Sequence, residues 1–273
     1  MKTKEQNMKS NNPFADSAQI MPALFVGHGS PMNAIEDNEF SRAWIQAGKA
    51  LPQPTAILCV SAHWETRGTF VTAMEHPKTI HDFGGFPRAL YEYQYPAPGS
   101  PALARLTQET APKVKIGLDQ TWGLDHGTWL VLSRMFPDAN IPIVQLSLDH
   151  FQAPAFHYAL GRELRALRNK GVLIVGSGNI VHNLGMAIFD DDQAYDWAIE
   201  FDETIKQLIL AGDHESIVHY EDLGRAARLS IPTNEHYLPL LYMLALQDKD
   251  EPVRFFGDRV TFGSLSMRSL RIG

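Results

Sequence analysis

The sequence predicts a single α/β domain with a central mixed, mostly parallel sheet flanked by helices, and a β-hairpin at its C-terminal end. Several short apolar runs show no alternation with polar residues, which is typical of parallel strands covered on both faces. These runs alternate along the chain with segments of helical periodicity, which indicates an α/β architecture. The chain ends in two strand-like runs around Gly257-Asp258, a pair that favours a hairpin turn.

The elements follow from apolar runs of strand length and from apolar residues at helical spacing between cap and stop signals. The expected strands are Leu24–Val26, Ala56–Ala62, Thr69–Met74, a short strand at Val114 and Ile116, Ile141–Leu148, Val172–Val175, Val253–Phe256 and Arg259–Ile272. The expected helices are Asp37–Ala50, Ser100–Thr110, Thr128–Phe136, Phe156–Leu167, Trp197–Leu208 and Leu238–Leu246.

The stretch from His76 to Ser100 shows no regular period and is rich in aromatic side chains around Gly84-Gly85. A structureless stretch of that length is unusual in a compact domain and is often a lid or a binding loop. An irregular segment packed by its own aromatic side chains explains the same pattern, and the sequence does not choose between the two.

Residues 1–19 are polar, rich in Lys, Asn and Ser, and lack the apolar centre of a signal peptide. We therefore expect a flexible polar tail over 1–19 and a single catalytic α/β domain over 20–273. No stretch has the apolar length needed to span a bilayer, so we expect no membrane partner and a cytoplasmic protein. The single cysteine, Cys59, lies in an apolar run, which fits a reducing compartment.

The formal net charge is -7, and the chain carries no basic stripe. This balance argues against a nucleic-acid partner, because nucleic-acid binding needs a positively charged footprint. We expect small-molecule partners, and the sequence leaves a homo-oligomer open.

Histidines recur where predicted strands end and predicted helices begin. Such junctions share one edge of a parallel sheet, where ligand sites form. His28, for example, lies between two glycines directly after a strand, and glycine lets a bulky partner approach closely. One histidine of this kind is more often structural, but their repetition predicts a metal site. The candidates are His28, His63, His126, His182 and His236.

Imidazole ligands suit Zn(II) and Fe(II), whereas Mg(II) prefers oxygen ligands. Two or three histidines with open positions are typical of a catalytic metal site. Non-haem iron oxygenases usually add a carboxylate, and the nearest carboxylates in sequence are Glu235, Glu65 and Asp125. Spacing alone does not select the third ligand.

Two other motifs compete with this interpretation. Gly176-Ser177-Gly178 follows a strand as a dinucleotide loop does, but Val181 stands where the third glycine is needed. His214 and His219 flank a glutamate in a pattern close to the zinc-protease HExxH, yet the spacing is one residue too long for one helix face. We interpret both histidines as surface residues. No G-x-S-x-G motif supports a serine hydrolase.

A set of motifs occurs in one order from about Met21 to Gly273. They are Phe25-Val26-Gly27-His28-Gly29-Ser30-Pro31, Val60-Ser61-Ala62-His63-Trp64, Ile80-His81-Asp82-Phe83-Gly84-Gly85-Phe86-Pro87, Tyr95-Pro96-Ala97-Pro98-Gly99, Asp125-His126-Gly127, Gly176-Ser177-Gly178-Asn179, His182-Asn183 and Glu235-His236-Tyr237-Leu238-Pro239. This set resembles the DODA-type extradiol ring-opening dioxygenases, most closely the bacterial 4,5-DOPA extradiol group of the class III, LigB-like superfamily.

The resemblance implies a single α/β domain that cleaves a catechol ring next to its diol with O2. It implies that His28 and His63 are metal ligands and that His236 is the third. It implies that His182 lies close to the metal as a ligand or an acid/base, and that His126 faces the substrate. Many superfamily members use glutamate as the third ligand, so His236 is a departure that leaves the metal open between Fe(II) and Zn(II).

The leading hypothesis is an extradiol dioxygenase that inserts O2 beside the diol of a DOPA-like catechol at the 4,5-position. Fe(II) is expected for activity, and Zn(II) also suits the histidine set. His182 and His126 are the expected catalytic residues. The alternatives are a zinc-dependent hydrolase and a non-catalytic metal-binding or interaction protein on the same fold. Arg67 and Arg88 are the cations considered for a substrate carboxylate, and position alone selects neither.

Overall fold

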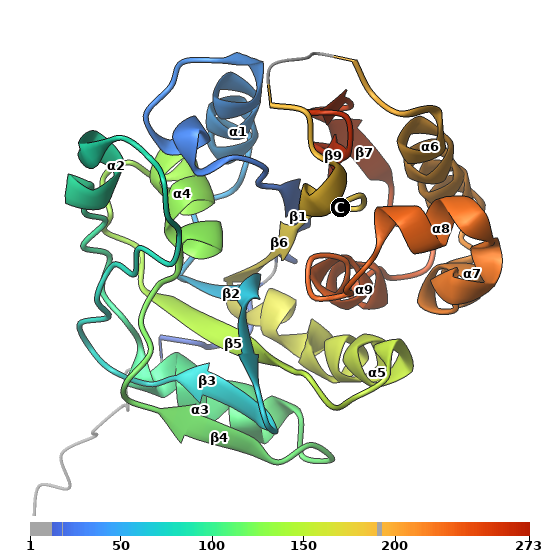
Figure 1. Cartoon of the computed structure of the whole chain (residues 1–273). Coiled ribbons are helices and arrows are strands. Elements are labelled where there is room, and N and C mark those ends of the chain that lie inside the picture. The colour runs from blue at the N-terminus through green and yellow to red at the C-terminus, as the bar shows by residue number, and fades with distance from the viewer. Residues whose placement is uncertain (1–12, 18, 190–192) are drawn as a thin grey trace, which may run out of the picture.

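Strands from across the chain form one mixed sheet in the order β4-β3-β5-β2-β6-β1-β10-β7 (Figure 1). The computed structural model describes residues 13–17, 19–189 and 193–273. The strands of this sheet are β1 Ala23–Gly27, β2 Ala56–Thr66, β3 Thr69–Thr72, β4 Ile116–Asp119, β5 Ile143–Asp149, β6 Val172–Gly178, β7 Val253–Phe256 and β10 Ser269–Ile272. A separate antiparallel pair consists of β8 Val260–Thr261 and β9 Leu265–Ser266.

The centre of the sheet is parallel, as predicted. β1 pairs with β6, β6 with β2, and β2 with β5, all in parallel. β3 and β4 also pair in parallel, but β3 meets β5 in the antiparallel direction. At the other edge β10 pairs antiparallel with both β1 and β7. The carboxyl ends of β1, β6 and β2 therefore meet at one edge of the sheet.

Helices cover both faces of the sheet. They are α1 Glu39–Lys49, α2 Arg88–Glu92, α3 Pro101–Thr110, α4 His126–Met135, α5 Pro154–Leu164, α6 Asp196–Ala211, α7 His214–Val218, α8 Arg225–Ser230 and α9 Leu238–Ala245. Short 3-10 helices are η1 Pro31–Ala34, η2 Arg165–Lys170, η3 Leu184–Met186 and η4 Tyr220–Leu223. None of the described helices combines the length and the apolar character needed to cross a membrane.

Alternation along the strands divides the core into two layers. Leu24 and Val26 of β1 pack in the layer of α1, α2 and α4. Ala23 and Phe25 pack on the other side, in the layer of α3 and α5–α9 (Figure 1). Since both faces of β1 are buried, its sequence is a continuous apolar run rather than an alternating one.

The predicted helix over Asp37–Ala50 is α1. The Asn38 side chain accepts hydrogen bonds from the backbone N–H groups of Phe40 and Ser41, and Trp44 is buried. The cap satisfies two of the first backbone N–H groups, which otherwise have no partner within the helix.

The predicted C-terminal hairpin exists as the antiparallel pair β7 and β10, but the two-residue turn expected at Gly257-Asp258 is wrong. Twelve residues, 257–268, separate the two strands and contain the β8–β9 pair. The chain leaves the sheet here because Arg268 is buried against α6. Its Nη2 lies 2.6 Å from Asp202 Oδ2, an ion pair that ties the excursion to that helix.

Of the predicted flexible tail, residues 1–12 and 18 lie outside the described residues. The described part is packed onto the domain: Phe14 is buried in the core layer of α3 and α5–α9. The backbone N–H of Ser17 donates to Asn169 O at 2.6 Å, and Asp16 pairs with Lys170 at 2.9 Å. The packed chain thus begins before residue 20, because Phe14 gains apolar burial there.

Candidate metal centre and active site

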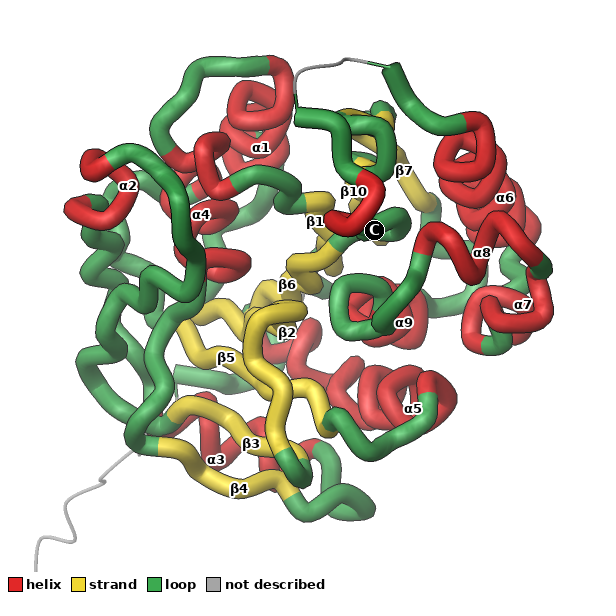
Figure 2. The backbone as a smooth tube through the Cα atoms, in the orientation of Figure 1, coloured by secondary structure: helices red, strands yellow, loops and turns green. Residues whose placement is uncertain are grey.

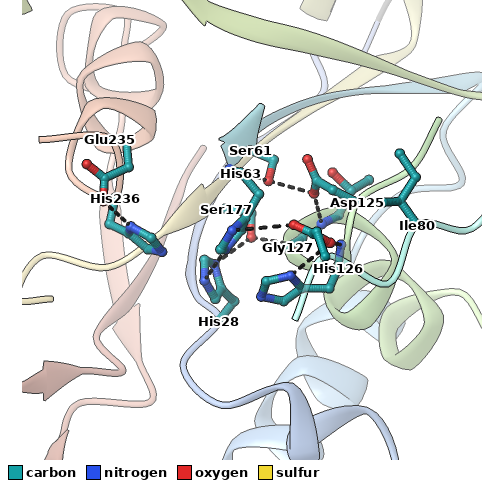
Figure 3. A network of polar contacts seen from close by, with 12 residues as sticks. His28, Ser61, His63, Ile80, Asp125, His126, Gly127, Ser177, Glu235 and His236 are labelled. Carbon is teal, nitrogen blue, oxygen red and sulfur yellow. Dashed lines mark hydrogen bonds and ion pairs between the residues drawn. The ribbon is translucent and has the colours of Figure 1, made fainter. Parts of the chain in front are cut away.

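The five predicted histidines come together at the carboxyl edge of the sheet. The rings of His28 and His63 lie 5.0 Å apart, His28 and His236 5.3 Å, and His63 and His126 3.9 Å, centre to centre. His182 stacks on His236 at 3.4 Å with the ring planes 5° apart. All five line one cavity of about 430 Å³, together with Asp82 and apolar side chains. Figure 3 shows four of these histidines, with His28 between His126 and His236.

The parallel pairing explains why residues so far apart in sequence meet. His28 follows β1 directly, and its backbone N–H donates to Gly178 O at the end of β6. One residue further, the backbone N–H of Asn179 donates to His236 O at 2.8 Å. His63 lies within β2, which continues to Thr66 rather than ending at Ala62 as predicted. The end of β1, the interior of β2 and the hydrogen bonds of the residues at the end of β6 thus bring His28, His63 and His236 to one point of the edge.

The histidine nitrogens form two adjoining sets that are each able to hold a metal ion. Single nitrogen atoms of His28, His63 and His126 all lie within 4.8 Å of one another. Ligand atoms of His182, Glu235 and His236 form the second set under the same limit. The histidines of both sets line the same cavity, so the His28–His63 pair has His126 and His236 as neighbours.

Ser177 determines which nitrogen of His28 carries the proton. The buried Ser177 hydroxyl lies 2.6 Å from Gly127 O, and a carbonyl can only accept, so the hydroxyl donates there. The same oxygen lies 3.0 Å from His28 Nδ1 and must accept from it. His28 is therefore protonated on Nδ1, which leaves the Nε2 lone pair facing His63 Nε2 at 3.1 Å (Figure 3).

Glu235 determines which nitrogen of His236 carries the proton. Its Oε1 lies 2.9 Å from His236 Nδ1, and a carboxylate accepts, so His236 is protonated on Nδ1. The other nitrogen, His236 Nε2, is buried and has no hydrogen-bond partner among the described residues. In Figure 3 Glu235 lies on the side of His236 away from His28. A buried nitrogen without a partner is costly unless it meets a ligand, so this atom is suited to a metal ion.

The Asp82 carboxylate lies next to the rings of His126 and His63. Its Oδ1 accepts from the backbone N–H of His126 at 2.9 Å and lies 3.0 Å from His126 Nδ1. Its Oδ2 lies 3.6 Å from His63 Nδ1. The charge of a carboxylate this close to both rings favours a proton on each Nδ1, as the outer partners of metal-bound histidines do, while His126 Nδ1 itself makes no hydrogen bond among the described residues.

The ring centres of His28, His63 and His236 are spaced as three ligands of one ion would be, whereas the ligand atoms within 4.8 Å of one another belong to His28, His63 and His126. The ring centres of His28, His63 and His236 are 5.0, 5.3 and 4.9 Å apart. Three imidazoles bound to one tetrahedral ion through nitrogens at about 2.0–2.1 Å have ring centres roughly 5 Å apart. The nitrogen donors, the fixed tautomers of His28 and His236 and the buried, unpartnered Nε2 of His236 therefore suit a borderline ion such as Zn(II) or Fe(II).

Burial keeps these rings uncharged. It lowers the pKa of His28 and of His236 well below the usual value, and the neighbouring histidines lower both further. Burial likewise lowers the pKa of His63 well below the usual value and that of His182 to about 4. Burial by itself would raise the pKa of Asp82, but its hydrogen bond to His126 and the adjacent rings lower it overall. Neutral rings keep a free lone pair, which metal binding and proton uptake both require.

The other carboxylates considered as ligands have different roles. Asp125 is completely buried at the start of α4, where it accepts from Thr128 N at 3.0 Å and from Ser61 Oγ at 2.7 Å. Glu65 pairs with the exposed His150 at 2.9 Å outside the histidine cavity. Neither carboxylate lines the cavity.

The aromatic stretch from His76 to Ser100 is partly a binding loop and partly packed into the domain, the two possibilities that its sequence left open. Asp82, Phe83, Gly84 and Phe86 line the cavity, as a binding loop does. Tyr95 is buried instead, and its hydroxyl lies 2.9 Å from Phe136 O and 3.2 Å from Leu132 O in the α4 region, so its one proton is shared between the two carbonyls. Figure 2 shows this loop-rich stretch running along the side of the molecule where α2 and α4 lie.

The two arginines considered for a substrate carboxylate lie outside the cavity lining. The Arg67 guanidinium lies 4.4 Å from the centre of the Phe151 ring, and Arg88 pairs with Glu92 at 2.6 Å on the exposed face of α2. His214, expected on the surface, is half-buried and bonds to the Tyr158 hydroxyl at 3.0 Å.

Sequence reasoning assigned no role to Asp82 or Ser177. Asp82 is the only acidic residue between Glu75 and Glu92, and this isolation in an aromatic stretch was an available signal. Ser177 belongs to the Gly176-Ser177-Gly178 segment at the end of β6, which the sequence singles out as a motif without indicating a role for the serine. Neither role is visible locally, because each side chain acts on a histidine from another element.

Comparison with known proteins agrees with this geometry. Residues 22–269 match the family model for the catalytic LigB subunit of aromatic ring-opening dioxygenase. The chain is 52% identical to the 4,5-DOPA dioxygenase extradiol of Escherichia coli (strain K12), over 94% of this chain and 96% of that protein. It is 37% identical to the 4,5-DOPA dioxygenase extradiol of Beta vulgaris, over 81% and 85% of the two chains.

A solved structure shows the same fold. The crystal structure of an uncharacterized protein from Escherichia coli K12 superimposes with a TM-score of 0.82 at 46% identity, covering 93% of this chain and 100% of that chain. The family match makes this protein an oxidoreductase with a small-molecule substrate and a non-haem metal. The chain belongs to the LigB family of aromatic ring-opening dioxygenases.

Proposed function

We propose that this enzyme cleaves the ring of a DOPA-like catechol beside its diol, at the 4,5-position, with O2 at a non-haem metal ion. The observation that carries the proposal is the set of tautomer-fixed imidazoles at the inner end of an aromatic-walled cavity. The activity named for the relatives from Escherichia coli and Beta vulgaris supports a DOPA-like substrate.

His28, His63 and His236 would hold the metal ion, with His182 beside them. The equal spacing of the three rings and the unpartnered Nε2 of His236 support this set. Glu235 would act by fixing His236 rather than as a ligand, since its Oε1 is engaged with His236 Nδ1. Fe(II), when bound, would supply Lewis acidity toward the two catechol oxygens and the redox chemistry of O2.

His182 would take up a phenolic proton of the substrate. It lies on the cavity wall and stacks on His236, so a catechol directed at the metal-binding rings comes close to it. Burial lowers the pKa of His182 to about 4, so its imidazole is neutral near pH 7 and has a free lone pair for this proton.

His126 would direct Nε2 toward the substrate or O2, because its Nδ1 lies next to Asp82. Phe83 packs edge-on against the His126 ring at 5.5 Å and lines the cavity with Phe86. These aromatic walls would exclude water and contact the substrate ring.

The test is anaerobic loading of metal-free protein with Fe(II), followed by DOPA and O2. We expect O2 uptake and a yellow ring-opened product, both lost in His28→Ala and His63→Ala. Absence of O2 uptake with DOPA and with every simple catechol would refute the proposal. Turnover that persists without O2, with Zn(II) in place of Fe(II), would instead support a zinc hydrolase.

The ligand set has a separate test that needs no turnover. We expect His236→Ala to lose stoichiometric Zn(II) binding, whereas Glu235→Ala and His126→Ala keep one ion per chain at lower affinity. Loss of stoichiometric binding in His126→Ala with retention in His236→Ala would show that His126, not His236, is the third ligand.

The cytoplasmic location, the single catalytic unit over 20–273 and the homo-oligomer left open by the sequence stay predictions. Gel filtration with light scattering measures the last of these.

A further inference from the structure

The lining of the histidine cavity contains both buried histidines and exposed apolar side chains. Its polar lining includes nearly buried groups, such as His28 and His236, which are 1% and 6% exposed. Its apolar lining extends to the solvent: Leu184 is 55% and Phe189 65% exposed. The apolar lining residues are Pro31, Phe83, Phe86, Leu184, Phe189, Phe262 and Leu265.

The apolar rim is defined here as Leu184, Phe189 and Phe262. The rings of Phe189 and Phe262 lie 5.6 Å apart, and Leu184 lines the same cavity. Exposed large apolar side chains grouped at a cavity mouth typically mark a surface that a ligand covers. A ligand whose ring reaches the buried histidines would have its ring substituent at this rim.

The charges around the cavity disfavour a negatively charged substituent. Asp82 lines the cavity, and among its described lining residues there is neither lysine nor arginine. A neighbouring pocket shares Ser30 and Phe262 with it and contains Arg42 and Arg259. Both guanidinium groups there already pair with carboxylates, Arg42 with Asp37 at 3.2 Å and Arg259 with Glu39 at 2.6 Å.

We propose that the site prefers catechols with an uncharged, apolar ring substituent over catechols whose substituent ends in a carboxylate. The inference rests on the proposed ring-opening function and refines its substrate class. DOPA remains a substrate, but the carboxylate and the ammonium group of its zwitterionic side chain would both lose water at an apolar rim whose lining offers the carboxylate no cation, whereas an alkyl or aryl substituent gains apolar burial there.

The test compares kcat/KM of the Fe(II)-loaded enzyme for 4-methylcatechol, 4-butylcatechol, 3-(3,4-dihydroxyphenyl)propionate and DOPA. A buried methylene contributes about fourfold, so we expect 4-butylcatechol to exceed 4-methylcatechol by about tenfold or more, mainly through a lower KM. We expect the propionate and DOPA to fall below 4-butylcatechol by about tenfold or more. Equal values across the panel, or highest values for the two carboxylates, would overturn the inference while leaving the ring-opening function intact.

The rim residues provide a matched pair of variants. Phe189→Ser should remove most of the preference for 4-butylcatechol, whereas Phe151→Ser should keep it. Phe151 is 62% exposed, close to Phe189 at 65%, but it lies outside the cavity lining. An unchanged preference in Phe189→Ser, or an equal loss in both variants, would contradict the role of the rim.

A binding measurement separates this inference from the proposed function. Calorimetry with Zn(II)-loaded protein without O2 should rank the four catechols in the same order, with a more negative heat-capacity change for 4-butylcatechol than for 4-methylcatechol. If no catechol is turned over but this ranking holds, the ring-opening function fails and the apolar preference stands. If turnover is normal and the ranking is flat, only the apolar preference fails.

Discussion

The Ser177→Ala variant tests whether hydrogen bonds behind the histidines prepare the metal centre. The substitution removes one buried hydroxyl, which donates to Gly127 O at 2.6 Å and accepts from His28 Nδ1 at 3.0 Å. Without it, nothing holds the proton of His28 on Nδ1, and the lone pair of Nε2 is no longer directed at the metal position.

The expected magnitude follows from these two contacts. Removing an outer partner of a metal-bound histidine typically costs 10–100-fold in metal affinity, which corresponds to about 1.4–2.7 kcal/mol. The variant also leaves the Gly127 carbonyl and the His28 N–H buried without a partner, each at about 1–3 kcal/mol of folding stability. We therefore expect weaker metal binding together with a lower free energy of unfolding.

The assay is competitive Zn(II) titration of metal-free protein against a chromophoric chelator, with urea unfolding on the same samples. Ser133→Ala is the matched control. Its hydroxyl is also buried and donates to the Leu130 carbonyl at 3.1 Å within α4, but it does not line the cavity. We expect Ser133→Ala to lose about 1 kcal/mol of stability and to keep the Zn(II) affinity of the wild type.

Zn(II) affinity of Ser177→Ala within threefold of the wild type would refute the reasoning. An equal loss of affinity in Ser133→Ala would also refute it, because the effect would then reflect general destabilisation of the fold rather than the tautomer of His28.

Three further predictions follow from the structure. Asp82→Asn keeps the shape of the side chain but places a neutral amide beside Nδ1 of His126 and of His63. We expect a 10–100-fold loss of kcat/KM and of Zn(II) affinity without a large change in the urea midpoint of unfolding. Wild-type Zn(II) affinity in this variant would contradict the prediction. His157 is fully buried against the Tyr242 hydroxyl, and burial lowers its pKa to about 4. The unfolded chain therefore takes up its proton first, and stability is lost as pH falls from about 6.5 toward 4. Between pH 7 and pH 5 the wild type should lose about 2 kcal/mol more unfolding free energy than His157→Gln, and parallel pH profiles would disprove this. In Gly178→Ala the new methyl group would collide with His236 O, so we expect weaker Zn(II) binding and a lower urea midpoint, and normal values of both would rule out the close approach.

The sequence was sufficient for the helices and strands whose burial pattern is local. The helix over Asp37–Ala50 and the strand Val172–Val175 follow from periodicity, and the structure contains both as α1 and β6. The turn at Gly257-Asp258 was predicted wrongly, because the chain there is held by the long-range pair between Arg268 and Asp202. Such a pair leaves no periodic trace in the sequence.

The sequence by itself determined that the histidines come together. His28 and His182 follow strands in the sequence, and the carboxyl ends of parallel strands meet at one edge of the sheet. Which nitrogen each ring offers was decided only by tertiary structure. Ser177 is 149 residues from His28, so the contact that sets the tautomer of His28 depends on strand pairing rather than on neighbouring residues.

The choice of the third ligand also depends on side-chain contacts that only the tertiary structure sets. Glu235 and His236 are adjacent in sequence, and spacing could not rank them as ligands. The fold directs the Glu235 carboxylate to His236 Nδ1 and leaves Nε2 buried without a partner, so the choice depends on side-chain direction. Sequence patterns specify which face of an element a residue occupies, whereas hydrogen bonds between distant elements determine where its reactive atom points.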